Sequence, residues 1–303
     1  MVFKLENSVN QRILVPNNYG VELFVKREDA IHPFISGNKY RKLKYNIEGA
    51  KRLGFKKLLT FGGAFSNHIA AVAYAGKMFD FETIGVIRGE ELRSKIKENS
   101  TLSFAASCGM RFEFVSREAY RHKHSESFLT ALRHFYNDFY LLPEGGTNTL
   151  AVKGCEEILN AGDVDFDFVC SAVGTGGTIS GLINSSKSRQ QVLGFPALKG
   201  DFLQEDISKF ANKKNWSLIL DYHFGGYAKI NIALIDFINQ FKKDHDIALD
   251  PVYTGKMMYG IFDLIKKGYF PDKSKILVIH TGGLQGIIGM NKTLKQKNWP
   301  LIE

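Results

Sequence analysis

A segment rich in glycine and threonine, Val173-Gly174-Thr175-Gly176-Gly177-Thr178, has the composition of an anion-binding loop. It follows an apolar, strand-like run and begins a stretch with helical spacing. The backbone N–H groups of such a loop, together with the first turn of the helix, form an anion site. Thr175 and Thr178 add hydroxyl donors. The segment therefore predicts a site for a phosphate group.

The spacing of these glycines disfavours two common phosphate-containing ligands. A dinucleotide fingerprint requires GxGxxG or GxGxxA, whereas the third position here is Ile179. The next strand-like run ends at Gly194-Phe195 with no acidic residue to bind a ribose. A Walker A loop requires Gly-Lys-Ser/Thr, which the segment lacks. A single phosphate monoester at a helix end fits better.

A second segment, Gly37-Asn38-Lys39-Tyr40-Arg41-Lys42-Leu43, places lysines shortly after a strand-like run that ends in Lys26-Arg27-Glu28-Asp29. A lysine acts as a nucleophile or base when desolvation or nearby positive charge lowers its pKa. The alternative is a helix N-terminus with surface lysines, and this segment alone does not decide between them.

Together with other segments, this one resembles the D-cysteine desulfhydrase and 1-aminocyclopropane-1-carboxylate deaminase family. That family belongs to the tryptophan synthase β-like (fold type II) pyridoxal-phosphate enzymes. The resemblance covers most of the chain, and ordered matches are far more specific than any single one. Besides Lys26–Asp29 and Ser36–Leu43, the matching segments are Phe61–His68, Pro143–Gly146, Gly174–Thr178, Asp250–Lys256, His280–Gly283 and, more loosely, Phe224–Tyr227.

The resemblance implies pyridoxal 5'-phosphate as the cofactor, held covalently by Lys39. It also implies that Asn67 contacts the ring hydroxyl of the cofactor. The phosphate would lie on the family's glycine loop, which here consists of Gly174, Thr175, Gly176, Gly177 and Thr178. Lys39, once displaced by the substrate, would serve as a base near the α-carbon.

The substrate site is implied in the same way. Ser66 and the N–H groups near it are expected to bind the substrate carboxylate, and Asn67 and His68 belong to the same loop. Tyr227 and Tyr253 are candidates for contact with the leaving group or the carboxylate. Packing is an equally good explanation for both tyrosines, because a buried tyrosine supplies apolar area as well as a hydroxyl.

Thr254 and Thr281 bear on the type of reaction. Aminocyclopropane-carboxylate deaminases of this family typically carry Glu and Leu at these two places, whereas D-cysteine desulfhydrases typically carry Thr or Ser. A carboxylate beside the pyridine nitrogen favours its protonation and a stronger electron sink, and a hydroxyl favours the neutral ring. The weaker sink suffices when a leaving group is present on the β-carbon. The alternative is that both threonines cap helices.

One segment departs from the family pattern. After Ser66-Asn67-His68 the chain continues Ile-Ala-Ala-Val-Ala, where better-known desulfhydrases have a more polar stretch with Arg and Gln. The carboxylate pocket is therefore expected to differ, and the native substrate stays open.

Three hypotheses follow. The first is β-elimination from D-cysteine or a similar small D-amino acid, giving pyruvate and ammonia. The second is ring opening of 1-aminocyclopropane-1-carboxylate, and the third is a cofactor-binding protein with little activity.

Strand-like and helix-like runs alternate along the chain, which predicts an α/β fold with parallel sheets covered on both faces. Glycine clusters follow several of the strands, and ligands of open α/β sheets bind at the carboxyl ends of strands. Strands are expected at 21–25, 57–61, 83–87, 111–115, 139–142, 166–172, 191–195, 218–222 and 276–280, and helices at 40–53, 68–79, 148–161, 178–186, 230–241 and 254–267.

The resemblance adds a division into two domains and a homodimer. A smaller domain, residues 44–148, is expected to be inserted into a larger cofactor-binding domain formed by residues 1–43 and 149–303. No linker or internal repeat marks these boundaries.

Composition restricts the other classes of function. The 303 residues are 44% hydrophobic and 23% charged, as is typical of a soluble globular protein. The net charge of +9 is spread in short pairs, without the basic block or stripe of a nucleic-acid site. No apolar run is long enough to span a bilayer and no targeting signal is visible, so a cytoplasmic protein is expected. Three scattered cysteines and the His122/His124 pair predict neither a disulfide framework nor a metal site.

Overall fold

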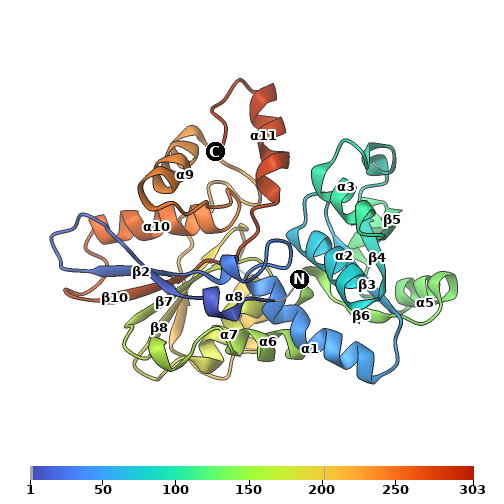
Figure 1. Cartoon of the computed structure of the whole chain (residues 1–303), viewed down its shortest axis with the longest axis horizontal. Coiled ribbons are helices and arrows are strands. Elements are labelled where there is room, and N and C mark those ends of the chain that lie inside the picture. The colour runs from blue at the N-terminus through green and yellow to red at the C-terminus, as the bar shows by residue number, and fades with distance from the viewer. Residues whose placement is uncertain (1–2, 201) are drawn as a thin grey trace.

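The computed structural model describes residues 3–200 and 202–303, which form two helix-covered sheets (Figure 1). All strand pairings are parallel except the one between β1 and β2. The predicted α/β fold with parallel-rich sheets is confirmed. The larger sheet has the order β1 (Asn10–Ile13), β2 (Glu22–Lys26), β10 (Lys275–Ile279), β7 (Phe168–Val173), β8 (Gln191–Pro196), β9 (Trp216–Leu218), and the smaller has the order β5 (Arg111–Val115), β4 (Glu82–Arg88), β3 (Lys57–Gly62), β6 (Tyr140–Leu142).

Both faces of the larger sheet are covered, which explains its continuously apolar strands. In β7, Cys170 and Ala172 point to the core formed with α9 (Ile232–His245) and α10 (Thr254–Lys266). The alternate residues Val169 and Val173 pack toward α6 (Thr149–Glu156) and α7 (Gly177–Ser185) on the opposite face (Figure 1).

The smaller sheet is covered in the same alternating manner. Leu58 of β3 packs with α2 (Asn67–Phe79) and α3 (Ser100–Ser107), whereas its neighbour Leu59 faces α4 (Arg117–Arg121) and α5 (Glu126–Tyr136). The remaining helical segments are α8 (Phe202–Ser208), α11 (Gly286–Gln296) and the short 3-10 turns Leu5–Asn7, Glu28–Ile31, Glu90–Lys95, Glu144–Gly146 and Ala161–Asp163.

Helix α1 (Asn38–Arg52) contacts both sheet units. Leu43 and Ile47 belong to the core of the smaller unit. On the larger unit, a Cβ added to Gly154 of α6 would lie only 1.9 Å from the carbonyl oxygen of Arg41, so the two helices touch backbone to backbone. The expected domain boundary between residues 43 and 44 falls inside this continuous helix. The division into 1–43 with 149–303 and 44–148 stays a prediction.

Several elements differ from the prediction. The strand expected at 218–222 is shifted toward the N-terminus. Strand β9 ends at Leu218, which forms the last pair with β8, and a turn begins at Asp221. The helix expected at 148–161 ends at Glu156. Strand β1 and the helices α3, α4, α5, α8 and α11 were not predicted. Two helices begin within the polar stretch 116–127. The hydroxyls of Ser116 and Ser125 accept backbone N–H groups as the N-caps of α4 and α5.

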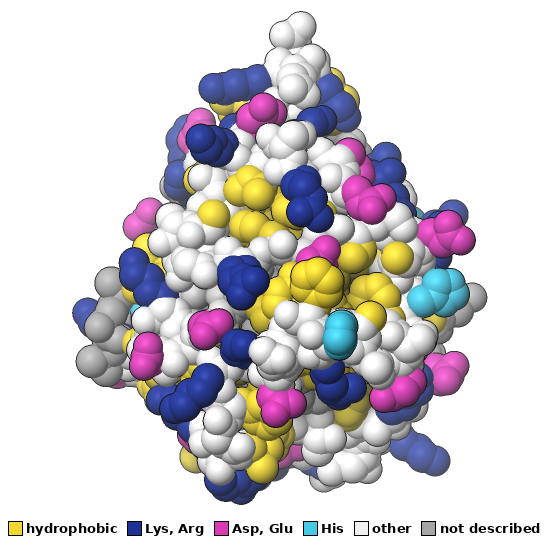
Figure 2. Space-filling view, turned by 90° about the vertical axis from the view of Figure 1, so that its right-hand side faces the viewer, with side chains coloured by type: hydrophobic (Ala, Val, Ile, Leu, Met, Phe, Trp, Pro, Cys, Tyr) yellow, Lys and Arg dark blue, Asp and Glu magenta, His cyan; other side chains and the backbone are white. Residues whose placement is uncertain are grey.

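No helix within 3–200 or 202–303 is both long enough and apolar enough to cross a membrane. On the face of the smaller unit, Lys and Arg side chains lie scattered among Asp and Glu, and apolar side chains gather near the centre (Figure 2).

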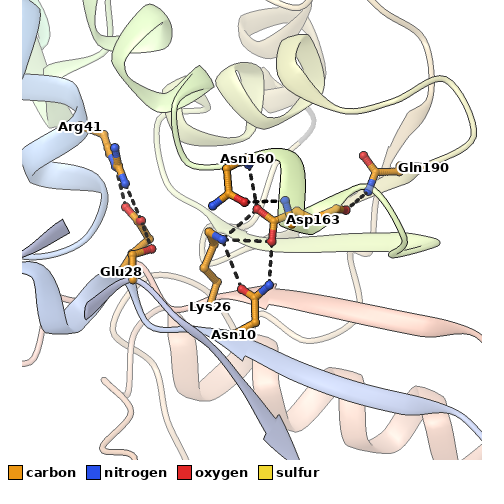
Figure 3. A network of polar contacts seen from close by, with 9 residues as sticks. Asn10, Lys26, Glu28, Arg41, Asn160, Asp163 and Gln190 are labelled. Carbon is orange, nitrogen blue, oxygen red and sulfur yellow. Dashed lines mark hydrogen bonds and ion pairs between the residues drawn. The ribbon is translucent and has the colours of Figure 1, made fainter. Parts of the chain in front are cut away.

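The Lys26–Asp29 segment, which begins at the last residue of β2, supplies one partner to each of two buried ion pairs, Lys26 with Asp163 and Glu28 with Arg41 (Figure 3). Lys26 Nζ lies 2.8 Å from Asp163 Oδ2, and both side chains are 2% exposed. Asn10 donates to Asp163 Oδ1 over 2.7 Å, and the Asn160 N–H donates to Oδ2 over 2.9 Å. These bonds compensate the desolvation of the carboxylate, and they attach β1 and β2 to the turn before β7.

Removing one charge of this pair tests its energetic role. In Asp163→Asn, Lys26 stays buried without a carboxylate, so the free energy of unfolding should fall by about 3–5 kcal/mol. Glu22→Gln is the matched control, because Glu22 makes an ion pair of the same 2.8 Å length with Arg12 at the surface. Loss of that exposed pair should change stability by about 1 kcal/mol or less. Urea denaturation measures both, and equal effects would contradict the interpretation.

Candidate active site

The loops that follow β2, β3, β6, β7 and β10 converge beside the first turn of α1. A Cβ added to Gly37 would lie 2.2 Å from the carbonyl oxygen of Thr281, after β10. A Cβ added to Gly283, in the same loop, would lie 2.6 Å from Nδ2 of Asn67, which follows β3. A Cβ added to Gly145, which follows β6, would lie 2.7 Å from Oγ1 of Thr175, which follows β7. The predicted site segments are therefore neighbours in space, as expected for the carboxyl ends of strands.

Lys39 is positioned by the residues on either side of it. Gly37 has φ +58° and packs against the backbone at Thr281, so no other residue fits there without strain. Arg41 forms a bidentate pair with Glu28, with both bonds 2.8 Å long. Lys39 Nζ donates to Asn38 Oδ1 over 2.7 Å, and Asn38 Nδ2 donates to Thr178 Oγ1 over 2.8 Å. Asn38 thus connects the lysine to the glycine loop.

The environment of Lys39 makes it a base near neutral pH. Burial and the nearby positive charge of Lys42 lower the pKa of Lys39 to about 7. The negative charge of Asp250 opposes this shift only weakly. Burial also lowers the pKa of Lys42, whose Nζ donates to the Gly145 carbonyl over 2.9 Å and to Thr147 Oγ1 over 3.2 Å.

The Gly174–Thr178 loop ends at the start of α7, where the helix offers open donors. Gly176 is the N-cap with φ +81°, and no side chain caps the helix. The first N–H groups of α7 are thus left for a ligand. Thr175 Oγ1 lies 2.6 Å from Thr147 Oγ1, which brings the Lys42 ammonium toward the same loop. An uncapped helix start with two hydroxyls and a nearby cation fits a phosphate.

Two buried polar atoms of the Ser66–His68 segment have no hydrogen-bond partner within the described chain. They are Asn67 Oδ1 and His68 Nδ1. An orphaned buried acceptor indicates a missing ligand or water, and Asn67 therefore fits the cofactor ring that the resemblance implies. Ser66 itself caps α2, since its Oγ accepts the Ile69 N–H over 3.3 Å.

His68 is built into the wall beside this segment. Its Nε2 lies 2.9 Å from Thr60 Oγ1, and Thr60 donates its own proton to the Leu142 carbonyl. Nε2 must therefore be the protonated ring nitrogen, which leaves Nδ1 as an acceptor. Burial lowers the pKa of His68 well below its ordinary value, so the ring is neutral. Its Cε1 faces the Gly146 backbone, 2.7 Å from the position of an added Cβ.

The two candidate tyrosines lie together at the other side of the glycine loop. The rings of Tyr227 and Tyr253 have centroids 6.3 Å apart, and Tyr253 Cε1 would lie 3.2 Å from a Cβ at Gly174. Tyr227 is 42% exposed. Burial raises the pKa of both hydroxyls, and Tyr227 adds to the rise at Tyr253, so both are neutral donors at neutral pH.

Lys256 and Asp250 hold these tyrosines in place, and the sequence did not single them out. Lys256 Nζ donates to the carbonyls of His223 and Gly226 over 2.9 and 2.8 Å, which anchors the turn before Tyr227. Asp250 accepts the N–H groups of Val252, Tyr253 and Thr254 at the start of α10. An Asp shortly before a helical run is a recognisable capping signal.

The structure distinguishes the two threonines. Thr254 is fully buried, donates to Asp250 Oδ2 over 2.8 Å and accepts the Asp250 N–H over 2.9 Å. Its hydroxyl proton is therefore used within the turn before α10, in the bond to Asp250. The Thr281 hydroxyl makes no hydrogen bond within the described residues, although the side chain is 6% exposed. Thr281 does not cap α11, whose N-cap is Gln285. Thr281 is thus the residue with a hydroxyl available to a ligand.

The lowered pKa of Lys39 predicts its titration. Below about pH 7 the amine is protonated, and above it the neutral nucleophile is present, whereas an ordinary lysine needs a pH near 10.5. Labelling with an amine reagent, followed by peptide mass spectrometry, should therefore reach half its maximal rate near pH 7. Lys42→Met removes a like charge and should move this midpoint upward, and the exposed Lys153→Met should not. A wild-type midpoint near 10 would contradict the assignment.

Among the described residues, no group of three or more His, Cys, Asp or Glu side chains is arranged to bind a metal ion.

Comparison with known proteins identifies the family. A sequence profile described as "Pyridoxal-phosphate dependent enzyme" matches residues 12–282. A Pyrococcus horikoshii protein, provisionally named as a 1-aminocyclopropane-1-carboxylate deaminase, is 31% identical over 90% of this chain and 87% of its own length. The mitochondrial bifunctional D-cysteine desulfhydrase/1-aminocyclopropane-1-carboxylate deaminase of Arabidopsis thaliana is 30% identical over 90% of this chain and 74% of its own.

A solved structure agrees with these relatives. The crystal structure of a homologue of 1-aminocyclopropane-1-carboxylate deaminase superposes with a TM-score of 0.83 and 27% identity, over 96% of this chain and 93% of that one. This chain therefore belongs to the pyridoxal-phosphate-dependent enzymes, in the D-cysteine desulfhydrase and 1-aminocyclopropane-1-carboxylate deaminase family.

Proposed function

We propose that this enzyme catalyses β-elimination from D-cysteine or a similar small D-amino acid. For D-cysteine, one water enters, and pyruvate, ammonia and hydrogen sulfide leave. The observation that carries the proposal is Thr281, a residue with an available hydroxyl where the ring-opening enzymes have an apolar side chain.

The cofactor site would be assembled from the residues already described. Lys39 would hold the cofactor covalently, Asn67 would contact the ring hydroxyl, and the phosphate would lie on the loop with Thr175 and Thr178. Lys42 is added to these as a nearby cation, through its bonds to Gly145 and Thr147. Pyridoxal phosphate, when bound, supplies an electron sink for the negative charge that develops at the α-carbon.

The substrate would then be positioned and deprotonated by side chains of this chain. The first turn of α2, with Ser66 as its cap, would bind the α-carboxylate at a helix N-terminus. His68 Nδ1 is an orphaned acceptor available to this substrate loop. The Nζ of Lys39 would remove the α-proton, because a pKa of about 7 keeps much of it neutral at physiological pH. Tyr227 and Tyr253, as neutral phenols, would donate a proton to the departing sulfur.

A neutral partner for the ring nitrogen is supported by the geometry around Thr254 and Asp250. Both oxygens of the Asp250 carboxylate accept N–H bonds from the first turn of α10, and Oδ2 also accepts the Thr254 hydroxyl. The Thr281 hydroxyl, which has no partner within the described residues, would then be the donor to the ring nitrogen when the cofactor is bound. An unprotonated ring is a weaker electron sink than a protonated one, and it would suffice for a substrate whose β-substituent leaves as a stable anion.

Ring opening of 1-aminocyclopropane-1-carboxylate is the second candidate. It is favoured by the names of the Pyrococcus and Arabidopsis relatives, both of which include that activity. The third, a cofactor-binding protein with little activity, would carry the cofactor absorbance band without turning over any amino acid.

A cytoplasmic homodimer completes the proposal. The dimer is suggested by the family resemblance and by exposed apolar side chains such as Phe65 and Ile288, which are 49% and 60% exposed. Sedimentation of the purified enzyme at the monomer mass of 34.1 kDa would exclude the dimer.

The phosphate site predicts a loss of cofactor affinity. Thr175→Val or Thr178→Val removes a hydroxyl donor to a charged group, which is worth roughly 1.5–3 kcal/mol. Cofactor affinity, measured by equilibrium dialysis, should therefore fall about tenfold or more. Thr83→Val is the control, because Thr83 is a buried threonine on β4. Unchanged affinity in both loop variants would place the phosphate elsewhere.

The reaction type can be measured directly. The wild type should release a 2-oxo acid from D-cysteine or β-chloro-D-alanine faster than from 1-aminocyclopropane-1-carboxylate. Thr281→Ala should lower that rate, because the ring nitrogen loses its donor. Thr254→Val should mainly lower stability, because its hydroxyl belongs to the α10 turn. Faster ring opening than β-elimination in the wild type would refute the proposal.

A further inference from the structure

Arg88, the last residue of β4, presents a guanidinium group beside the proposed carboxylate-binding loop. Its Nη2 lies 3.8 Å from the position of a Cβ at Gly63, three residues before Ser66. The register of the smaller sheet explains this proximity, because Gly62 of β3 pairs with Ile87 of β4. Arg88 thus emerges next to the loop at the carboxyl end of the neighbouring strand.

This guanidinium has no carboxylate partner within ion-pair distance among the described residues, and it is exposed. It lies 5.8 Å from the ring centroid of Tyr120, whose hydroxyl donates to Glu144 over 2.8 Å. Glu144 is already paired with Lys123 over 3.2 Å. The nearest acid of this group is therefore occupied, while Arg88 keeps its positive charge available.

Arg88 also acts on one of the two candidate tyrosines. It is among the charges that oppose the raised pKa of Tyr227, and it has the same effect on Tyr120. The guanidinium thus lies beside Gly63 of the smaller unit, and its charge acts on the Tyr227 hydroxyl of the larger unit. A ligand between these two walls would extend its outer end toward Arg88.

The position is informative because the five residues of α2 that directly follow His68 carry no positive charge. The residues Ile69 to Ala73 are all buried in the core of the smaller unit. The α-carboxylate has the first turn of α2, whereas Arg88 is exposed at the outer side of the loop. Its charge is thus free for a second anionic group.

We propose that Arg88 is a specificity-determining residue that binds a negatively charged group on the side chain of the substrate. The inference rests on the proposed function for the orientation of the substrate. It names the preferred class as small amino acids whose β-substituent is an anionic leaving group, such as a sulfate or phosphate ester. Guanidinium groups suit these planar or multidentate oxyanions.

The test compares two ligands that lack a β leaving group and differ only in charge, aspartate and asparagine. Both enantiomers of each are titrated against the cofactor-loaded enzyme, with calorimetry or the cofactor absorbance as readout. The wild type should bind one enantiomer of aspartate about tenfold tighter than the matching asparagine, and added salt should reduce the difference.

Arg88→Gln should abolish the preference and leave asparagine binding unchanged. Arg133→Gln is the matched control, because Arg133 also lies 5.8 Å from an aromatic ring, that of Phe139, and is exposed on α5. It should keep the preference. Equal affinities in the wild type, or a preference that survives Arg88→Gln, would overturn the proposal. Binding is measured without turnover, so absence of β-elimination from D-cysteine would count against the proposed function and not against Arg88.

Discussion

The site depends on the buried ion pair between Glu28 and Arg41. Glu28 is fully buried, and its two oxygens accept both bonds from the guanidinium as well as the Ser8 hydroxyl. Charges this deeply buried are stable only when they are fully paired, so the ion pair fixes the position of α1 relative to β2. Lys39 lies two residues before Arg41, and its location follows from that docking.

The same segment also positions the far wall of the site. The carbonyl of Lys26, two residues before Glu28, accepts the His280 N–H over 3.0 Å, and His280 Nε2 donates to the Ala248 carbonyl over 2.7 Å. Thr281 follows directly, so the end of β2 and the residues just after it position both the lysine and the available hydroxyl. The consequence is a Lys39 amine held away from water, which lowers its pKa toward neutrality.

Much of the site could be predicted because its signals are local. Glycine clusters after apolar runs indicated where ligands approach the backbone, and ordered segments gave the family. What could not be predicted depends on pairing between distant elements. Arg88 reaches Gly63 only through the β3–β4 register, and Lys42 reaches Thr147 only because α1 packs on the other loops. Thr254 and Thr281 look equivalent in sequence, and only the bonds to Asp250 separate them.

The fold was predictable to a similar extent and for similar reasons. Strands buried on both faces leave continuous apolar runs, whereas the edge strand β1 and the polar helix starts at Ser116 and Ser125 do not. The edge strand β9 was misplaced because its apolar run continues beyond its last partner on β8.

The most direct test of the account is the site of covalent cofactor attachment. The cofactor-loaded enzyme would be reduced with borohydride, digested and mapped by mass spectrometry. The account predicts a pyridoxyl group on Lys39 alone, since this lysine has its pKa lowered to about 7. A pyridoxyl group on Lys42 or Lys44 instead would contradict it.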